Sequence, residues 1–148
     1  SMGNYYNTLS NAVMYYYAEN GEEHVFRAVN RLDKDTSGLM CIAKNRYTHA
    51  RLCSAFGTKA VRRKYLAIVC GKCEDSGTID KPIARESEGI IKRTISDEGA
   101  RAVTHYKSVK NFGNYSLIEL ELETGRTHQI RVHMSHIGYP LLGDWLYG

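Results

Sequence analysis

The sequence has no long hydrophobic run, no internal repeat and no low-complexity tract or interdomain linker. Its apolar runs fall short of the roughly 18 residues that a membrane-spanning helix requires, and no secretory signal opens it. We therefore expect a cytoplasmic protein with no membrane partner. A length of 148 residues suits one domain. Ser1 and Met2 resemble a remnant of cleavage and cloning, so the expected domain covers residues 3–148.

A strong excess of charge is also lacking. The formal net charge is only +4, from 20 lysines and arginines against 16 acidic residues. This balance permits a polyanionic partner without requiring one. Tryptophan is nearly absent, with one residue against 11 tyrosines. Exposed aromatic rings beside basic side chains can stack on nucleic-acid bases.

Of the four cysteines, Cys70 and Cys73 form a C-x-x-C pair, but a second pair at comparable spacing is missing. Without a secretory signal, the cysteines are expected to be reduced thiols. A structural zinc ion needs four ligands. His128 and His133 are spaced i, i+5, which places them on different faces of a helix. Packed or surface thiols are therefore favoured, and a zinc-dependent RNA-binding domain is the weaker alternative.

Capping residues and periodicity predict an α+β domain around a mixed or antiparallel sheet, with helices on its flanks. The predicted helices cover residues 9–19 after Thr8, 46–56 after Asn45, with Ala50, Cys53 and Phe56 inward, and 128–136 after Thr127. The predicted strands cover residues 38–43, 65–70, 102–109 and 115–123, with loops and short strands over 74–99. The segment 65–70 is apolar on both faces, which predicts a central strand.

The stretch V-N-R-L-D-K-D-T-S-G-L-M, residues 29–40, places Arg31 two residues before Asp33. In an extended segment the two side chains share a face. A nearby guanidinium favours the ionised form of a carboxylate, which suits a nucleophile or an electrostatic stabiliser better than a general acid. A surface ion pair beside an Asx-type turn is an equally good interpretation of these residues alone.

A second cluster is T-G-R-T-H-Q-I-R-V-H-M, residues 124–134. On a helix that begins near Thr127, His128 and Arg131 are i, i+3 neighbours. Arg131 can then reach a carboxylate across a cleft, while Arg126 in the turn contacts phosphate. The alternative is a basic, solvated helix.

The third cluster is a basic run, which leads directly into a tyrosine. Its cations can hold phosphates while Tyr65 stacks on a base. The alternative, a core tyrosine on a buried strand, is favoured for a tyrosine in such a position. The basic residues are Lys59, Arg62, Arg63 and Lys64.

Together, these segments resemble the RluA-type pseudouridine synthases. N-R-L-D-K-D-T-S-G-L-M is similar to the H-R-L-D-x-x-T-S-G-L signature of that family, and R-K-Y-L-A-I-V-C-G is similar to its K-x-Y-x-A-x-V-x-G strand. L-E-T-G-R-T-H-Q-I-R-V-H, followed by G-Y-P-L-L-G-D-W-L-Y-G, is similar to its third block. The resemblance runs in the same order over nearly the whole chain, and three long motifs in register are far more specific than one.

The resemblance implies the pseudouridine synthase fold and the isomerisation of uridine to pseudouridine in ribosomal or transfer RNA. Asp33 would be the catalytic aspartate, Arg131 its partner, and Arg31 a residue that displaces the target base. Tyr65 would pack on the uracil and take part in proton removal from C5. Asp35 would then belong to the turn. The reaction needs no metal or other cofactor. Further RNA contacts would come from Arg62, Arg63, Lys64, Arg126 and His128.

Two departures from the family pattern matter. Asn30 stands where histidine is usual, a change that we expect to be tolerated. The chain also starts after the family's N-K-P-x-G segment and stops before its L-H-A block, so it resembles a catalytic domain truncated at both ends. Exposed strand edges would then favour self-association. An RNA-binding domain without catalytic activity is the alternative function.

Overall fold

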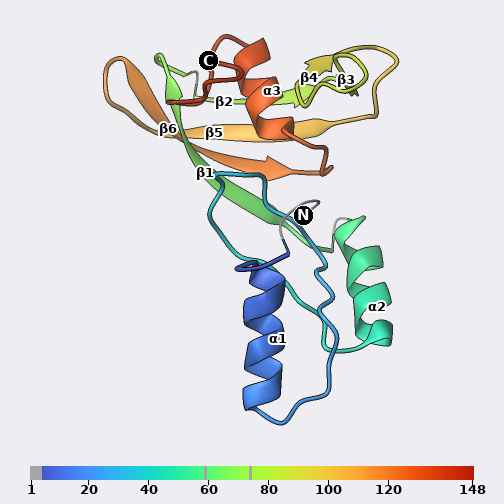
Figure 1. Cartoon of the computed structure of the whole chain (residues 1–148). Helices are drawn as coiled ribbons and strands as arrows, with labels where there is room; N and C mark the ends of the chain where they lie inside the picture. Colours follow the sequence, from blue (N-terminus) through green and yellow to red (C-terminus); the bar gives the residue numbers. More distant parts are fainter. Residues whose placement is uncertain (1–4, 59, 74) are drawn as a thin grey trace. The chain divides into compact units, whose positions relative to one another are not determined.

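The computed structural model describes residues 5–58, 60–73 and 75–148, with helices α1 to α3 and strands β1 to β6 (Figure 1). The interpretation of Ser1 and Met2 and the role predicted for Lys59 concern residues outside this description. The chain forms two compact units, residues 1–60 and 61–148. Among the described residues, no helix is long and apolar enough to span a membrane.

The first unit contains two helices whose start sites were predicted from their caps. Helix α1, Leu9–Glu19, begins at Thr8, whose hydroxyl accepts a hydrogen bond from the Asn11 amide at 3.2 Å. Helix α2, Arg46–Phe56, begins at Asn45. Both predicted caps are confirmed. The prediction succeeded because a cap is a local interaction, in which a side chain satisfies the first backbone N–H groups of a helix.

The packing predicted for α2 is wrong in part. Ala50 and Cys53 are exposed, whereas Phe56 is half-buried as expected. The half-buried side of the helix also carries His49 and Leu52. His49 packs inward because its ring Nε2 lies 3.2 Å from the Ala28 carbonyl oxygen, a contact that hydrophobic periodicity does not detect.

The strand predicted for residues 38–43 is not formed. This segment makes one isolated antiparallel bridge, between Ala28 and Ile42, and Leu39 is 93% exposed. The reason is the side chain of Asn30, which accepts from the Cys41 amide and donates to the Leu39 carbonyl. A side chain therefore occupies the backbone groups that a neighbouring strand would need.

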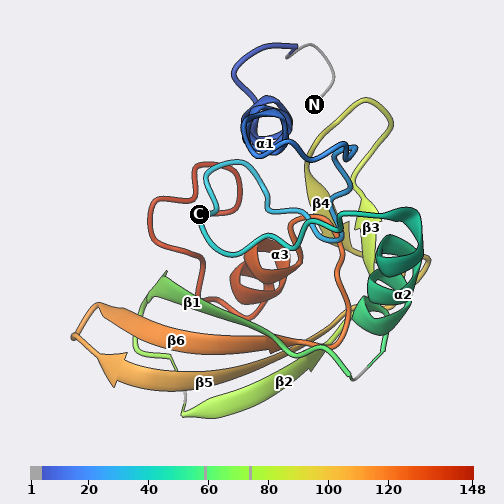
Figure 2. The ribbon, with the colours of Figure 1, turned by 90° about the horizontal axis from the view of Figure 1, so that it is seen from below.

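The second unit is built on a four-stranded antiparallel sheet in the order β1-β6-β5-β2 (Figure 2). The strands are β1 (Arg63–Cys70), β2 (Ser76–Asp80), β5 (Val103–Asn111) and β6 (Tyr115–Leu122). Strands β3 (Ile83–Arg85) and β4 (Arg93–Ile95) form a separate hairpin. The predicted α+β class is thus confirmed, and every pairing between named strands is antiparallel.

The predicted central position of the strand over 65–70 is wrong, because β1 lies at an edge of the sheet. Leu66 and Ile68 are 69% and 47% exposed on its outer face. At its far end, the segment around Leu141 covers the open edge: Val69 bridges to Leu141, and the Cys70 amide donates to the Pro140 carbonyl. An apolar run does not distinguish a central strand from such an edge strand.

Helix α3, Gln129–His136, packs on the inner face of the sheet (Figure 2). The main core lies between them and consists of Val69, Cys73, Ile79, Tyr106, Ile118, Leu120 and Met134. A smaller core joins α3 to the β3–β4 hairpin and the C-terminal segment. It contains Ile83, Ala102 and Val132, with Ile95 and Tyr147 packed against it.

Candidate active site

The predicted catalytic aspartate lies on a loop, residues 31–40, that is pinned at its base. The Asn30 side chain makes two hydrogen bonds there, 2.7 Å from its Oδ1 to the Cys41 amide and 3.1 Å from its Nδ2 to the Leu39 carbonyl. The Val29 amide adds a bond to the Cys41 carbonyl at 2.8 Å. Asn30, the residue that departs from the family pattern, therefore closes the loop that carries Asp33.

The two aspartates of this loop differ in backbone conformation and in burial. Asp35 has a left-handed backbone with φ 66°, which aspartate tolerates better than most residues. The Thr36 amide donates to the Asp33 carbonyl at 3.1 Å and closes a turn around Lys34 and Asp35. The prediction that Asp35 belongs to the turn is confirmed. Asp33 is half-buried and Arg31 is exposed.

The other predicted site residues belong to the second unit. Tyr65 lies on β1 opposite Leu120, on the inner face of the sheet, and packs against the main core. Its side chain remains half-buried rather than fully enclosed. One part of the Tyr65 side chain therefore contacts the core, and another part remains accessible to solvent.

Arg131 is held on two sides. Its Nε and Nη2 donate to the two carboxylate oxygens of Asp144 at 2.7 and 2.8 Å, and its guanidinium lies 4.8 Å from the centre of the Tyr147 ring. The side chains of Arg131 and Asp144 are 19% and 4% exposed. Hydrogen bonds from Arg131 hold the pKa of the Asp144 carboxyl below its ordinary value. A bidentate pair of this kind fixes the plane of the guanidinium.

Asp144 also organises its own segment. Its Oδ1 accepts hydrogen bonds from the amides of Leu146 and Tyr147 at 3.0 and 3.2 Å. Sequence reasoning assigned no role to Asp144 or Tyr147, although both lie in the quoted G-D-W-L-Y-G block. The signal available in the sequence was Asp144 itself, which follows a glycine and precedes a tryptophan. Aspartate side chains commonly accept hydrogen bonds from the backbone of a turn.

His128 contacts Tyr147 as well. Its Nδ1 lies 2.8 Å from the Tyr147 hydroxyl, and that hydroxyl also accepts from the Arg93 amide at 2.8 Å. The prediction that His128 and Arg131 share a face is confirmed, because both side chains contact the ring of Tyr147. Burial raises the pKa of the Tyr147 hydroxyl.

The predicted cap of α3 is wrong. The residue at the cap position is His128, in a left-handed conformation with φ 59°, rather than Thr127. The preceding turn is closed instead by Gln129, whose Oε1 accepts from the Arg126 amide and the Thr124 hydroxyl. Gln129 is 2% exposed and donates to the Val103 carbonyl, so it anchors α3 to β5.

The basic residues before Tyr65 are engaged with strand β6. Arg62 makes a two-point ion pair with Glu121, at 2.9 and 2.7 Å, and Lys64 pairs with Glu119 at 2.8 Å. Arg63 points to the opposite face of the strand and donates to the Glu123 carbonyl at 3.1 Å.

Arg126 donates from Nε to the Arg101 carbonyl at 2.9 Å.

The two cysteines of the C-x-x-C pair differ in burial, because Cys73 lies in the core and Cys70 is half-buried. Cys73 is 2% exposed in the main core, and its amide donates to the Ser116 hydroxyl at 2.9 Å. His133 is fully buried between the Thr104 hydroxyl and the Lys81 carbonyl. In the described part of the chain, no group of three potential ligands could hold a metal ion.

A family model described as RNA pseudouridylate synthase matches residues 2–136. The chain belongs to this family, and its fold is the pseudouridine synthase fold.

Individual relatives carry related names. The chain is 49% identical over 152 residues to a ribosomal large subunit pseudouridine synthase D from Zymomonas mobilis, covering 99% of this chain and 48% of the relative. It is 44% identical over 142 residues to the uncharacterized RNA pseudouridine synthase YjbO of Bacillus subtilis, covering 95% and 50%. The chain thus spans about half the length of these curated relatives.

Solved structures agree. Human RNA pseudouridylate synthase domain containing 4 is 29% identical with a TM-score of 0.77, covering 95% of this chain and 57% of that one. Human RNA pseudouridylate synthase domain containing 1 is 32% identical with a TM-score of 0.73, covering 83% and 55%.

Proposed function

We propose that this chain carries the catalytic groups of an RNA pseudouridine synthase that isomerises specific uridines in structured ribosomal or transfer RNA. The observation that carries the proposal is the loop pinned by Asn30, which presents Asp33 while Asp35 serves the turn. Membership of the family and the names of its relatives support the reaction type.

The chemistry sets the demands on the site. The N1–C1′ bond of the uridine breaks, the uracil turns, and C5 bonds to C1′. C5 loses a proton and N1 gains one, so the product is an isomer of the substrate and no oxidant or reductant is consumed. The target base must leave its stack to become accessible. Water must also be kept from the sugar after cleavage.

Each proposed residue meets one of these demands. Asp33 acts as a carboxylate, either as a nucleophile at C1′ or as a base toward a ribose proton, with Arg131 as its cationic partner. Tyr65 packs on the uracil and assists removal of the C5 proton. Arg31 is exposed on the same loop as Asp33 and displaces the target base from the stack. The basic side chains of Arg62, Arg63, Lys64 and Arg126, together with His128, contribute to RNA binding.

The loop offers a matched pair of variants for the test. Asp33→Asn should abolish pseudouridine formation while RNA affinity stays within a few-fold. Asp35→Asn should keep activity within about twofold, because asparagine also tolerates the left-handed conformation. Ribosomal and transfer RNA from cells that lack the gene would serve as substrates, with pseudouridine measured by mass spectrometry.

Conversion of uridine by the Asp33→Asn protein would refute the catalytic assignment. RNA binding without product formation by the unmodified chain would instead identify an RNA-binding domain without activity.

A further inference from the structure

The β3–β4 hairpin places two arginines directly opposite each other. Arg85 and Arg93 are register partners, so their side chains leave the same face of the hairpin. Like charges at directly opposed positions destabilise a strand pair. A two-stranded sheet of three residues per strand has little other pairing to offset that repulsion. The arrangement is therefore better explained by a ligand than by the stability of the hairpin.

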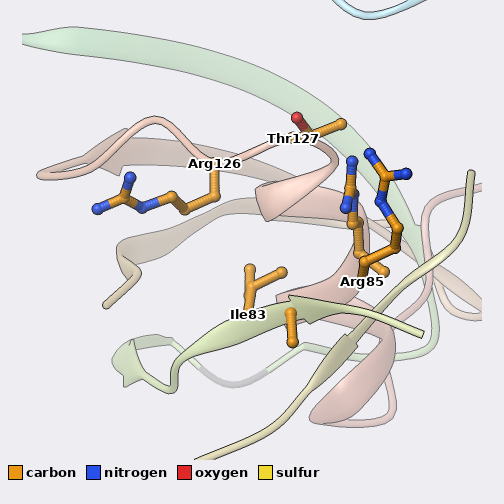
Figure 3. Close-up of a pocket in the computed structure, with 6 residues that line it drawn as sticks. Ile83, Arg85, Arg126 and Thr127 are labelled. Atoms are coloured by element: carbon orange, nitrogen blue, oxygen red, sulfur yellow. The ribbon is translucent and has the colours of Figure 1, made fainter. Parts of the chain in front are cut away.

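The same face borders a cavity of about 180 Å³, shown in Figure 3. Arg85 and Thr127 project toward the same side of the hairpin, whereas the guanidinium of Arg126 points away. The cavity is lined by Ile83, Ala84, Arg85, Arg93, Arg126 and Thr127. None of these residues carries a carboxylate, so the cavity is positive and contains a hydroxyl donor.

Neither arginine of the hairpin has a counter-ion among the residues that the structure describes. Within the described ranges, no carboxylate lies within ion-pair distance of Arg85 or Arg93, and the nearby Glu86 pairs with Lys92 at 3.5 Å. The Nε of Arg93 is buried and has no hydrogen-bond partner among the described residues. A buried cationic N–H without an acceptor is unfavourable until one arrives.

We propose that Arg85, Arg93 and the Thr127 hydroxyl bind one phosphodiester of the RNA backbone. The guanidinium fork suits two phosphate oxygens. Arg85 is exposed and Arg93 half-buried, so the site is open on one side and accepts a phosphate that continues into a chain. The assignment to RNA rests on the proposed function.

The site is linked to the proposed catalytic arginine through Tyr147. The Arg93 amide donates to the Tyr147 hydroxyl at 2.8 Å, and the guanidinium carbon of Arg131 lies 4.8 Å from the centre of the Tyr147 ring. Ile83 and Val132 share the small core next to this contact. A phosphate bound at the hairpin is therefore held at a fixed position relative to Arg131, which sets the register of the RNA.

Salt-dependent RNA binding tests this site. The double variant Arg85→Gln, Arg93→Gln should bind a structured ribosomal RNA fragment about fivefold to twentyfold more weakly. The plot of log affinity against log salt has a negative slope, and the magnitude of this slope should decrease by about 0.7 to 0.9, as expected for one lost phosphate contact. The control, Lys92→Gln with Lys107→Gln, removes two positive charges outside the cavity and should leave the slope unchanged. Equal effects of the two double variants would overturn the proposal.

A second measurement uses the Nε–H resonance of Arg93 in the unmodified chain. Titration with inorganic phosphate and with the RNA fragment should each shift this resonance. A shift with phosphate alone would make the cavity a site for free anions and overturn the RNA assignment, and no shift with either would overturn the site itself. If the chain forms no pseudouridine but the arginine variant still loses RNA affinity, the proposed function fails while this site stands.

Discussion

Asp144 joins Arg131 to the C-terminal segment: one carboxylate holds both guanidinium nitrogens and also accepts two backbone amides. Because the Asp144 side chain is only 4% exposed, water compensates little for any lost partner. The orientation of Arg131 therefore depends on a residue 13 positions further along the chain.

The first prediction concerns this pair. Asp144→Asn should lower the free energy of unfolding by about 3 kcal/mol, because it removes the negative charge that the largely buried Arg131 guanidinium contacts at two points. Asp80→Asn is the control, since Asp80 is 58% exposed and lies 3.9 Å from Arg101, and its effect should stay within about 0.5 kcal/mol. Urea denaturation measures both.

The same pair has a definite pH dependence. The folded-state pKa of Asp144 is lowered, so its contribution is present above the unfolded pKa of about 3.9 and is lost as pH falls through the folded value. The stability difference between the unmodified chain and Asp144→Asn should therefore shrink in acid. A difference that stays constant down to pH 2 would contradict this account.

The second prediction concerns His133, whose pKa is lowered chiefly by burial. Its Nε2 donates to the Lys81 carbonyl and its Nδ1 accepts from the Thr104 hydroxyl, which is the neutral ring form. The contribution of the neutral His133 ring to the free energy of unfolding should be fully present above about pH 6.5. Below that pH the free energy of unfolding should fall by up to about 1.4 kcal/mol per pH unit, because the unfolded chain binds a proton that the folded ring does not readily accept.

Two substitutions isolate this effect. His133→Gln should lower the free energy of unfolding at neutral pH and flatten its dependence on pH between pH 5 and 6.5. His136→Gln changes an exposed position of the same helix and should leave this pH dependence nearly unchanged. A slope that survives in His133→Gln would assign the proton uptake to another group.

The third prediction concerns the basic run before Tyr65. Exposed ion pairs such as Arg62–Glu121 and Lys64–Glu119 contribute little stability, so phosphates can replace the glutamates. The double variant Glu119→Gln, Glu121→Gln should therefore raise RNA affinity several-fold at low salt. Glu19→Gln with Glu23→Gln changes the net charge equally at exposed positions of the first unit and serves as the control.

Affinity gains of the same size in both variants would show a general charge effect rather than contacts from Arg62 and Lys64. The comparison is best made at several salt concentrations, because a true phosphate contact also steepens the salt dependence.

Local signals in the sequence predicted local structure well. Thr8 and Asn45 marked their helices because a cap depends on residues within one turn. The alternation of Ile118, Leu120 and Leu122 with glutamates identified β6 for the same reason. The prediction about Asp35 succeeded because turn chemistry is also local.

Predictions that depend on distant partners did worse. The segment 38–43 looked like a strand, but the side chain of Asn30 takes its backbone groups. The edge position of β1 follows from strand order, which a run of apolar residues does not encode. The pairing of Arg131 with Asp144 was missed because nothing between them in the sequence indicates that the chain returns to α3.

The position of Asp144 has a spectroscopic consequence. The single tryptophan of the chain, Trp145, is the next residue and is 80% exposed. Indole emission responds to its immediate surroundings, so the fluorescence of this one side chain reports on the segment that orients Arg131. The chain thus contains its own optical probe for events at that arginine, and no label needs to be introduced.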